Sequence, residues 1–178
     1  MTATATDIRA TRPAPDEFAP YYGRYIDKVP DGDIVATLRN QIDETLGALH
    51  AIPDGRAGFR YAPDKWRIRE VVGHLSDAER IFTYRALRFA RGDETPLPGF
   101  DENAFVTRAR LDDRPFDGLI EEYAAVRAAS VALFDSLFPE EWTRRGIASD
   151  KGISVRALAW IAAGHERHHL GILKERYL

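Results

Sequence analysis

The sequence predicts an all-α protein, a four-helix bundle preceded by an extended N-terminal arm. Four segments of about 17 to 24 residues carry apolar side chains at helical spacing, and proline or glycine residues separate these segments. No segment shows the convincing alternation of apolar and polar residues that indicates a strand. Four amphipathic helices of this length bury their apolar faces most economically against one another.

The composition fits a single domain and excludes several classes of function. The chain has 178 residues and no cysteine, which rules out disulfides, thiolate metal ligands and a cysteine nucleophile. Its net charge is −3 and it has no basic block, which argues against a nucleic-acid partner. The first residues lack the apolar core of a secretory signal, and no apolar run is long enough to span a membrane. We therefore expect a cytoplasmic protein without a membrane partner.

Residues 1–30 form the predicted arm, and residues 31–178 form the bundle domain. The arm is rich in Thr, Ala and Pro and has no helical periodicity. Its second half carries four aromatic residues within eight positions, which is unusual for a disordered tail. We expect this half to pack on the bundle through Phe18, Tyr21, Tyr22 and Tyr25.

The first two helices are predicted from their apolar stripes and their flanking residues. The first begins at Asp31 or Asp33, has an apolar residue at every fourth position and ends before Pro53. The second extends from about Ile68 to Arg91. It is followed by a connection of about 24 residues, and connections of that length are often functional.

The third helix is predicted at about 116–137, and residues 139–142 fit one short turn. The last helix is predicted at about 155–176, after a loop at 148–154 in which Ser154 is the N-cap. This last helix contains three of the five histidines of the chain, His165, His168 and His169. Their positions therefore decide what the core of the bundle can bind.

His165 and His169 are expected to point into the bundle. A helix turns ~100° per residue, so these two side chains are ~40° apart, in the centre of the apolar stripe. On the second helix, His74 lies ~60° from the centre of the stripe, at the edge of the core. The three histidines are thus placed on the inner faces of two separate helices.

Four further residues are expected to surround these histidines. Glu70 and Asp77 lie one turn on either side of His74 and could accept a hydrogen bond from its ring. Glu166 and His168 flank the apolar stripe of the last helix, so they lie next to the histidines or in solvent.

A single inward histidine is more often a hydrogen-bonded core residue than a metal ligand. Two inward imidazoles one turn apart, however, have four ring nitrogens to satisfy, and a divalent cation can bind one nitrogen of each. We therefore favour a metal site at His165 and His169, with structural core histidines as the alternative. Because the chain has no cysteine, other protein ligands must be His, Asp or Glu.

Residues 165–169 also match the H-E-x-x-H signature of zinc metalloproteases, in which Glu166 would be the general base. Only nine residues follow His169, too few to supply a ligand from another helix. The positions that extend the motif in one protease class hold Ile172 and Glu175 in place of Gly and His. We interpret the match as metal ligands without protease activity.

The second helix carries three arginines near its C-terminal end. We expect them to be solvated or paired with carboxylates such as Glu79, and contact with an anionic substrate is the alternative. These arginines are Arg85, Arg88 and Arg91. Trp66 and Trp160 are expected to pack in the core, with lining of a pocket as the alternative.

Two segments resemble the DinB/YfiT-like superfamily of small helical proteins. "YAPDKWRIREVVGHLSDAERIFTYRALRFARGD" (61–93) resembles its Trp-led turn followed by a helix with H-L-x-D-x-E. "SVRALAWIAAGHERHHLGILKERY" (154–177) resembles its terminal helix with H-x-x-x-H. Together with residues 25–49 the resemblance covers about 150 residues, and the two motifs in this order and spacing are fairly specific.

The resemblance implies an up-down-down-up bundle with a divalent metal, zinc or nickel, on His74, His165 and His169. Three protein ligands leave positions open for water or substrate. The implied function is a metal-dependent enzyme for a small molecule: an S-transferase using a low-molecular-weight thiol such as bacillithiol or mycothiol, or a hydrolase. The alternative is a metal-binding protein without turnover, acting in stress response or as an interaction module. We also expect a homodimer, because the aromatic arm and the long connection need a surface to cover them.

Overall fold

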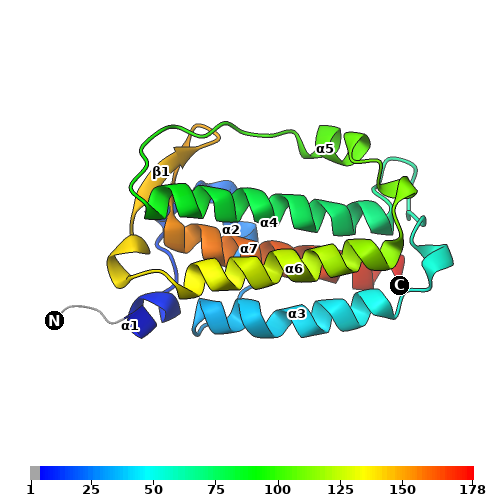
Figure 1. Cartoon of the computed structure of the whole chain (residues 1–178), viewed down its shortest axis with the longest axis horizontal. Helices are drawn as coiled ribbons and strands as arrows, with labels where there is room; N and C mark the ends of the chain where they lie inside the picture. The colour runs from blue at the N-terminus through cyan, green and yellow to red at the C-terminus, as the bar shows by residue number, and fades with distance from the viewer. Residues whose placement is uncertain (1–4) are drawn as a thin grey trace.

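The computed structural model describes residues 5–178, and four long helices lie side by side in it (Figure 1). They are α3 (Ile34–His50), α4 (Ile68–Ala90), α6 (Phe116–Asp135) and α7 (Val155–Ile172). Helices α3 and α7 run in one direction and α4 and α6 in the other (Figure 1). The predicted four-helix bundle is therefore confirmed, with the order up, down, down, up. None of the helices in the described residues is long and apolar enough to cross a membrane.

The predicted caps account for where two of these helices begin. The carboxylate of Asp33 accepts hydrogen bonds from the backbone N–H groups of Val35 and Ala36 at 2.8 and 3.1 Å. The hydroxyl of Ser154 accepts one from the N–H of Ala157 at 2.9 Å. Each cap satisfies donors that the first turn of a helix leaves without an internal acceptor.

Shorter elements join and flank the long helices. The short α-helices are α1 (Ala5–Ala10), α2 (Gly23–Ile26) and α5 (Glu102–Arg108). The strands are β1 (Arg145–Ala148) and β2 (Lys151–Ser154). Single 3-10 turns occupy Pro15–Glu17, Pro20–Tyr22, Asp54–Arg56, Leu111–Asp113 and Pro139–Glu141, and a π-helical turn at Leu173–Tyr177 ends the chain. The turn at Pro139–Glu141 agrees with the one predicted there.

The prediction of a loop at 148–154 is wrong, because this segment completes an antiparallel hairpin of β1 and β2. Ser149 and Asp150 form its turn with φ values of 53° and 61°, as a two-residue hairpin turn requires. Each strand has four residues, too few for a readable alternation, and the turn lacks the usual Asn-Gly or Asp-Gly pair. Leu97 pairs with the hairpin, donating its N–H to the carbonyl oxygen of Ile147 at 2.9 Å.

The N-terminal arm contains more regular structure than the sequence analysis indicates, because α1 and α2 are too short to show helical periodicity. As predicted, its second half packs on the bundle through aromatic residues. Tyr25 is buried, Phe18 and Tyr22 are half-buried, and Tyr21 remains exposed. Gly164 of α7 permits this contact, since a β-carbon there would lie 2.1 Å from the carbonyl oxygen of Tyr25.

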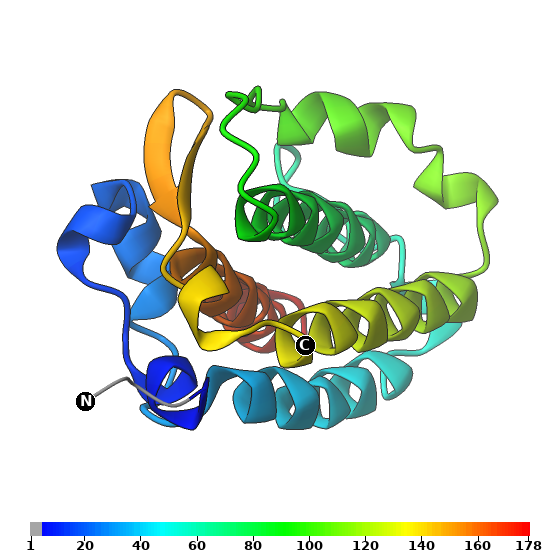
Figure 2. The same cartoon turned by 60° about the vertical axis from the view of Figure 1, so that its left-hand side comes forward.

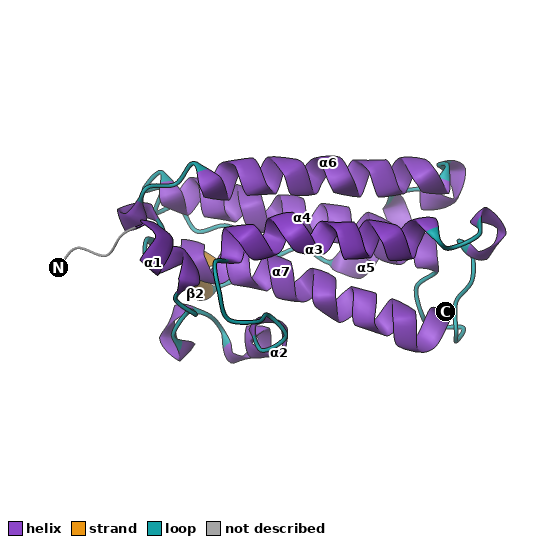
Figure 3. Cartoon of the chain, turned by 90° about the horizontal axis from the view of Figure 1, so that it is seen from below, coloured by secondary structure: helices purple, strands orange, loops and turns teal. Residues whose placement is uncertain are grey.

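The arm and the long connection therefore lie outside the four long helices, on different sides of the pair α4 and α7. Seen from the end, the connection with α5 arches over α4, while the arm and the hairpin flank α7 (Figure 2). Seen from below, α2 lies beside α7 (Figure 3). Helices α4 and α7 thus form the floor of a cavity, and the irregular segments form its walls.

Candidate metal site between α4 and α7

Three histidines from the two floor helices converge on one point. The Nε2 atom of His165 lies 3.0 Å from Nε2 of His74 and 3.1 Å from Nε2 of His169. Candidate ligand atoms of all three lie within 4.8 Å of one another. His74 and His165 are buried and His169 is half-buried, so the cluster has one side facing outward. All three side chains point into the bundle, as predicted from their positions on the two helices.

The protonation of these rings suits metal binding. Burial lowers the pKa of His74 to about 4. Burial, followed by the neighbouring histidines, lowers the pKa of His165 and His169 well below the ordinary value. Neutral imidazoles keep a lone pair available for a cation.

The distances from Nε2 of His165 to the Nε2 atoms of His74 and His169, 3.0 and 3.1 Å, also suit a shared cation. Two metal–nitrogen bonds of ~2.0–2.1 Å at right or tetrahedral angles place their nitrogens about 2.8–3.4 Å apart. Without a cation, the single lone pair of His165 Nε2 can accept a hydrogen bond from only one of its two neighbours. The donor set, its burial and its spacing therefore fit a divalent metal.

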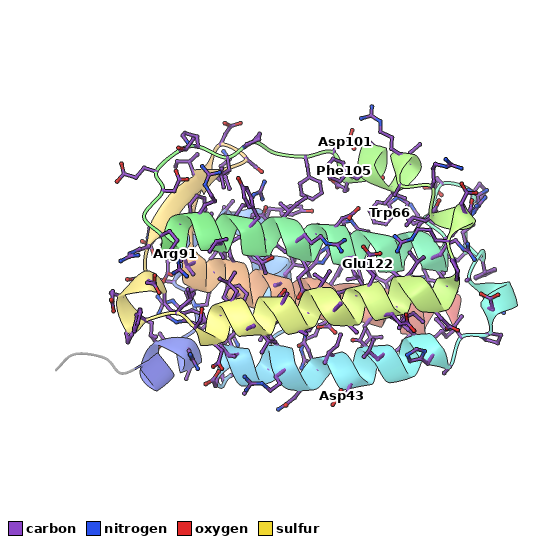
Figure 4. The ribbon with its side chains drawn as sticks, viewed as in Figure 1. Asp43, Trp66, Arg91, Asp101, Phe105 and Glu122 are labelled. Carbon is purple, nitrogen blue, oxygen red and sulfur yellow. The ribbon has the colours of Figure 1, made fainter. Side chains whose placement is uncertain are left out.

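Aromatic side chains hold the imidazoles in place. The ring of Trp66 lies 4.6 Å from that of His74, and the rings of Phe82 and Tyr25 lie 5.5 and 5.3 Å from that of His165. Trp66 sits near the start of α4, at the end of the bundle over which α5 passes (Figure 4). Rings packed on both helices limit the rotamers of the histidines and keep water from their flanks.

A cavity of about 260 Å³ opens beside the cluster. Its floor comes from α4 and α7, and its walls come from the segments outside the long helices. The arm contributes Tyr22 and Tyr25, the connection contributes Phe100 and Glu102, and the hairpin contributes Ser149. These wall residues were missed by sequence reasoning, although the aromatic arm and the length of the connection were the available signals.

The two tryptophans considered in the sequence, Trp66 and Trp160, have different roles. Trp66 lines the cavity, as the alternative interpretation held, whereas Trp160 is fully buried in the core. The guanidinium of Arg12 lies 4.7 Å from the ring centre of Trp160. Only Trp66 is therefore placed to contact a ligand.

The carboxylates expected beside His74 have other partners. Glu70 caps α4 by accepting a hydrogen bond from the backbone N–H of Arg67 at 2.6 Å. Asp77 is half-buried, 3.8 Å from Arg80, and burial raises the pKa of its carboxyl group. Across residues 5–178, neither carboxylate is hydrogen-bonded to His74. Of the flanking residues on α7, His168 lines the cavity, with its ring 5.1 Å from that of His169.

Glu166 points away from the histidines into a buried ion-pair network. Its Oε2 accepts a hydrogen bond from Nη1 of Arg127 at 2.6 Å and another from the side-chain amide of Gln41. Arg127 also donates to both carboxylate oxygens of Glu79, each at 2.7 Å. A carboxylate held in this way is not placed to act as a general base at the histidines, which agrees with our rejection of the metalloprotease interpretation.

Of the three arginines near the end of α4, two form ion pairs and one lines the cavity. Arg88 pairs with Asp93, and Arg91 pairs with Glu141 at 2.7 Å, at the end of α4 beside β1 (Figure 4). The expected partner Glu79 is instead occupied by the network in the core. Arg85 is buried and lines the cavity.

Comparison with known proteins places this fold and site in a family. A protein of Oceanobacillus iheyensis that carries the name putative metal-dependent hydrolase is 28% identical over 142 residues, 79% of each chain. YfiT of Bacillus subtilis, described as a probable metal-dependent hydrolase with an unusual four-helix bundle topology, matches with a TM-score of 0.70 and 17% identity. That match covers 93% of this chain and 90% of YfiT.

A mycothiol-dependent maleylpyruvate isomerase shares the fold with a TM-score of 0.68 and 12% identity. The match covers 82% of this chain and 61% of the isomerase, so the isomerase has a large part without a counterpart here. The family model of the DinB superfamily matches residues 37–173, which include all four long helices almost completely and the three clustered histidines. The chain belongs to the DinB superfamily.

Proposed function

We propose that this protein is a metal-dependent enzyme that holds a divalent cation, zinc or nickel, on His74, His165 and His169. The observation that carries the proposal is the convergence of three Nε2 atoms, with spacings of 3.0 and 3.1 Å, at the floor of a cavity. The names of the two relatives that refer to metal dependence support it. Three protein ligands leave coordination positions free on the cavity side.

The chain's own residues supply binding, orientation and exclusion of water. The imidazoles hold the cation, and the rings of Trp66 and Phe82 keep two of them in orientation. A divalent cation held by these histidines would lower the pKa of water or of a thiol and so supply a nucleophile near pH 7. The cavity volume of about 260 Å³ suits a small-molecule substrate.

Hydrolysis by activated water is the first candidate reaction, because the Oceanobacillus iheyensis protein and YfiT are both named as hydrolases. Transfer to a low-molecular-weight thiol, such as bacillithiol or mycothiol, is the second candidate. The mycothiol dependence of the structurally similar isomerase favours it, and the absence of cysteine means that the sulfur would come from a small molecule.

Metal titration tests the binding site. Purified metal-free protein should bind one equivalent of zinc, nickel or cobalt in calorimetry, and His74→Ala should reduce the affinity at least about tenfold. His50→Ala is the matched control, because His50 is exposed and lies 4.0 Å from Asp117, outside the cluster. Unchanged affinity in His74→Ala, or no binding by the wild-type protein, would contradict the proposal.

Cobalt substitution separates the two reactions. In the cobalt-loaded protein, thiol transfer predicts that an added thiol produces a thiolate-to-cobalt charge-transfer band. Hydrolysis predicts cleavage of small esters or amides without a thiol, and cleavage that is lost in His74→Ala. A loaded protein that shows neither response would be a metal-binding protein without turnover.

A further inference from the structure

Arg85 is a buried cation that has no carboxylate partner among residues 5–178. Arg85 is 3% exposed and lines the same cavity as the three histidines. Nη2 donates hydrogen bonds to the carbonyl oxygen of Pro98 at 2.8 Å and to the hydroxyl of Ser149 at 3.0 Å. Neither acceptor is charged, and across residues 5–178 no carboxylate forms an ion pair with Arg85.

An unpaired guanidinium at such a position is unusual, because burial of an uncompensated charge is costly. Burial lowers the pKa of Arg85, with only the Tyr22 hydroxyl acting against it. A guanidinium nevertheless stays charged at neutral pH. The hydrogen bonds to Pro98 and Ser149 both use Nη2, and the Tyr22 hydroxyl also interacts with the guanidinium, so of its five N–H groups some remain for a further acceptor.

The surroundings of Arg85 are suited to one anionic group. Tyr22 and Ser149 place hydroxyl groups beside the guanidinium, and both residues line the cavity. A second cavity residue, Arg24, bonds only to hydroxyl groups of Tyr21 and Tyr25, so it also lacks a carboxylate partner among the described residues. Two cations therefore face a cavity whose wall contains a single carboxylate, that of Glu102.

The position of Arg85 on α4 sets the length of ligand that can reach it. It follows His74 by eleven residues, which places it ~20° round the helix and about 16 Å along the axis. Both side chains lean toward the N-terminal end of α4 and both line the cavity, so only an extended molecule can contact the two. Ala78 and Phe82 lie between them along the helix and line the same cavity.

We propose that Arg85, with the hydroxyls of Tyr22 and Ser149, binds a carboxylate of the substrate while the reacting end of the substrate lies at the histidines. The substrate class is thus an extended small molecule with a terminal carboxylate, because one planar guanidinium matches one carboxylate. This inference rests on the proposed function for the reacting end of the molecule, and the carboxylate subsite is testable without it.

Straight-chain ω-mercaptocarboxylates of increasing length, each paired with its primary amide, are suitable probes. Binding is measured by calorimetry on metal-free and on cobalt-loaded protein, and the cobalt spectrum reports the thiolate separately. Once the chain is long enough to span the cavity, the acid should bind at least about tenfold more tightly than the amide, which is the effect expected of a charge-assisted hydrogen bond in a buried site. Equal affinities for acid and amide at every length would overturn the proposal.

Two variants locate the anion. Arg85→Met keeps much of the side-chain volume and should remove the preference for acid while leaving the affinity for the amide unchanged. Arg88→Met is the matched control, because Arg88 is one turn away and paired with Asp93, and it should keep the preference. A preference that survives in Arg85→Met, or that is complete for the shortest acid, would place the anion elsewhere and overturn the proposal.

The readouts also distinguish the failure of this inference from the failure of the proposed function. If the protein binds no cobalt yet prefers the acid, and Arg85→Met removes that preference, the carboxylate subsite stands and the metal-dependent function falls. If cobalt binds and thiols coordinate it with no preference for the acid, the metal function stands and the subsite is wrong. Because the comparison of acid with amide is made on the wild-type protein, equal affinities at every length, or a full preference for the shortest acid, overturn the proposal even if Arg85→Met does not fold.

Discussion

His165 and Glu166 are neighbours on α7, both buried, yet they belong to polar clusters of opposite character. His165 faces two other imidazoles at 3.0 and 3.1 Å. Glu166 faces the guanidinium of Arg127 at 2.6 Å, and the same guanidinium is shared with Glu79. The two side chains leave the helix in directions ~100° apart, so one helix serves the cavity and the centre of the bundle at the same time.

The difference lies in whether each cluster supplies its own partners. In the ion-pair network, the guanidinium of Arg127 donates hydrogen bonds to Glu79 and Glu166, so buried donors meet acceptors and only Oε1 of Glu166 has no partner among the described residues. In the histidine cluster, three Nε2 atoms meet with no charged partner, and burial lowers the pKa of each ring. The first cluster is therefore expected to stabilise the fold, and the second to bind something that the chain does not contain.

The largest effect should come from removing the cation of the ion-pair network. Arg127→Leu leaves Glu79 and Glu166 buried without their shared partner, and the loss of one member of a buried ion pair costs about 3–5 kcal/mol. Urea unfolding of the metal-free protein measures it. Arg114→Leu is the control, because Arg114 pairs with Glu122 near the surface and its loss should cost at most about 1 kcal/mol. Similar losses in both variants would show that the network is not a major source of stability.

A smaller effect is expected at Gly164, the residue before His165. Gly164→Ala places a β-carbon 2.1 Å from the backbone oxygen of Tyr25, so α2 must move away from α7. We expect a loss of about 1–3 kcal/mol, typical of overpacking, together with faster proteolysis of the arm. Gly171→Ala on the same helix meets nothing within 4 Å and should be neutral or stabilising. If Gly164→Ala behaves like Gly171→Ala, the arm is not held by this close approach.

The contrast between the two clusters also shows which features can be predicted from the sequence. The helices and their caps were predictable, because apolar periodicity, Asp33 and Ser154 are local signals. The inward direction of His165 was predictable, because it depends only on the turn of one helix. The partnership of Glu166 with Arg127 was not, because it depends on how α6 is rotated against α7, which no local pattern fixes.

The residues that form the walls of the cavity were even more difficult to predict from the sequence. Tyr22, Phe100 and Ser149 come from an arm, a connection and a hairpin turn that have little or no periodicity. Their meeting point is set by packing between segments distant in the chain, such as the approach of Tyr25 to Gly164. A buried Arg85 without a carboxylate could be recognised only when every neighbour had been placed.

The smallest change in stability should come from His165→Leu, although this variant should abolish metal binding. Leucine is close to histidine in volume, and it removes the ring whose one lone pair faces two other nitrogens. The free energy of unfolding of the metal-free protein should therefore change by less than about 1 kcal/mol, or rise. Glu166→Leu, one residue later, should cost more than this, because it removes the buried carboxylate that accepts hydrogen bonds from both Arg127 and Gln41. A loss in His165→Leu as large as that in Glu166→Leu would mean that the histidines are a structural cluster, and the distinction between the two sides of α7 would fail.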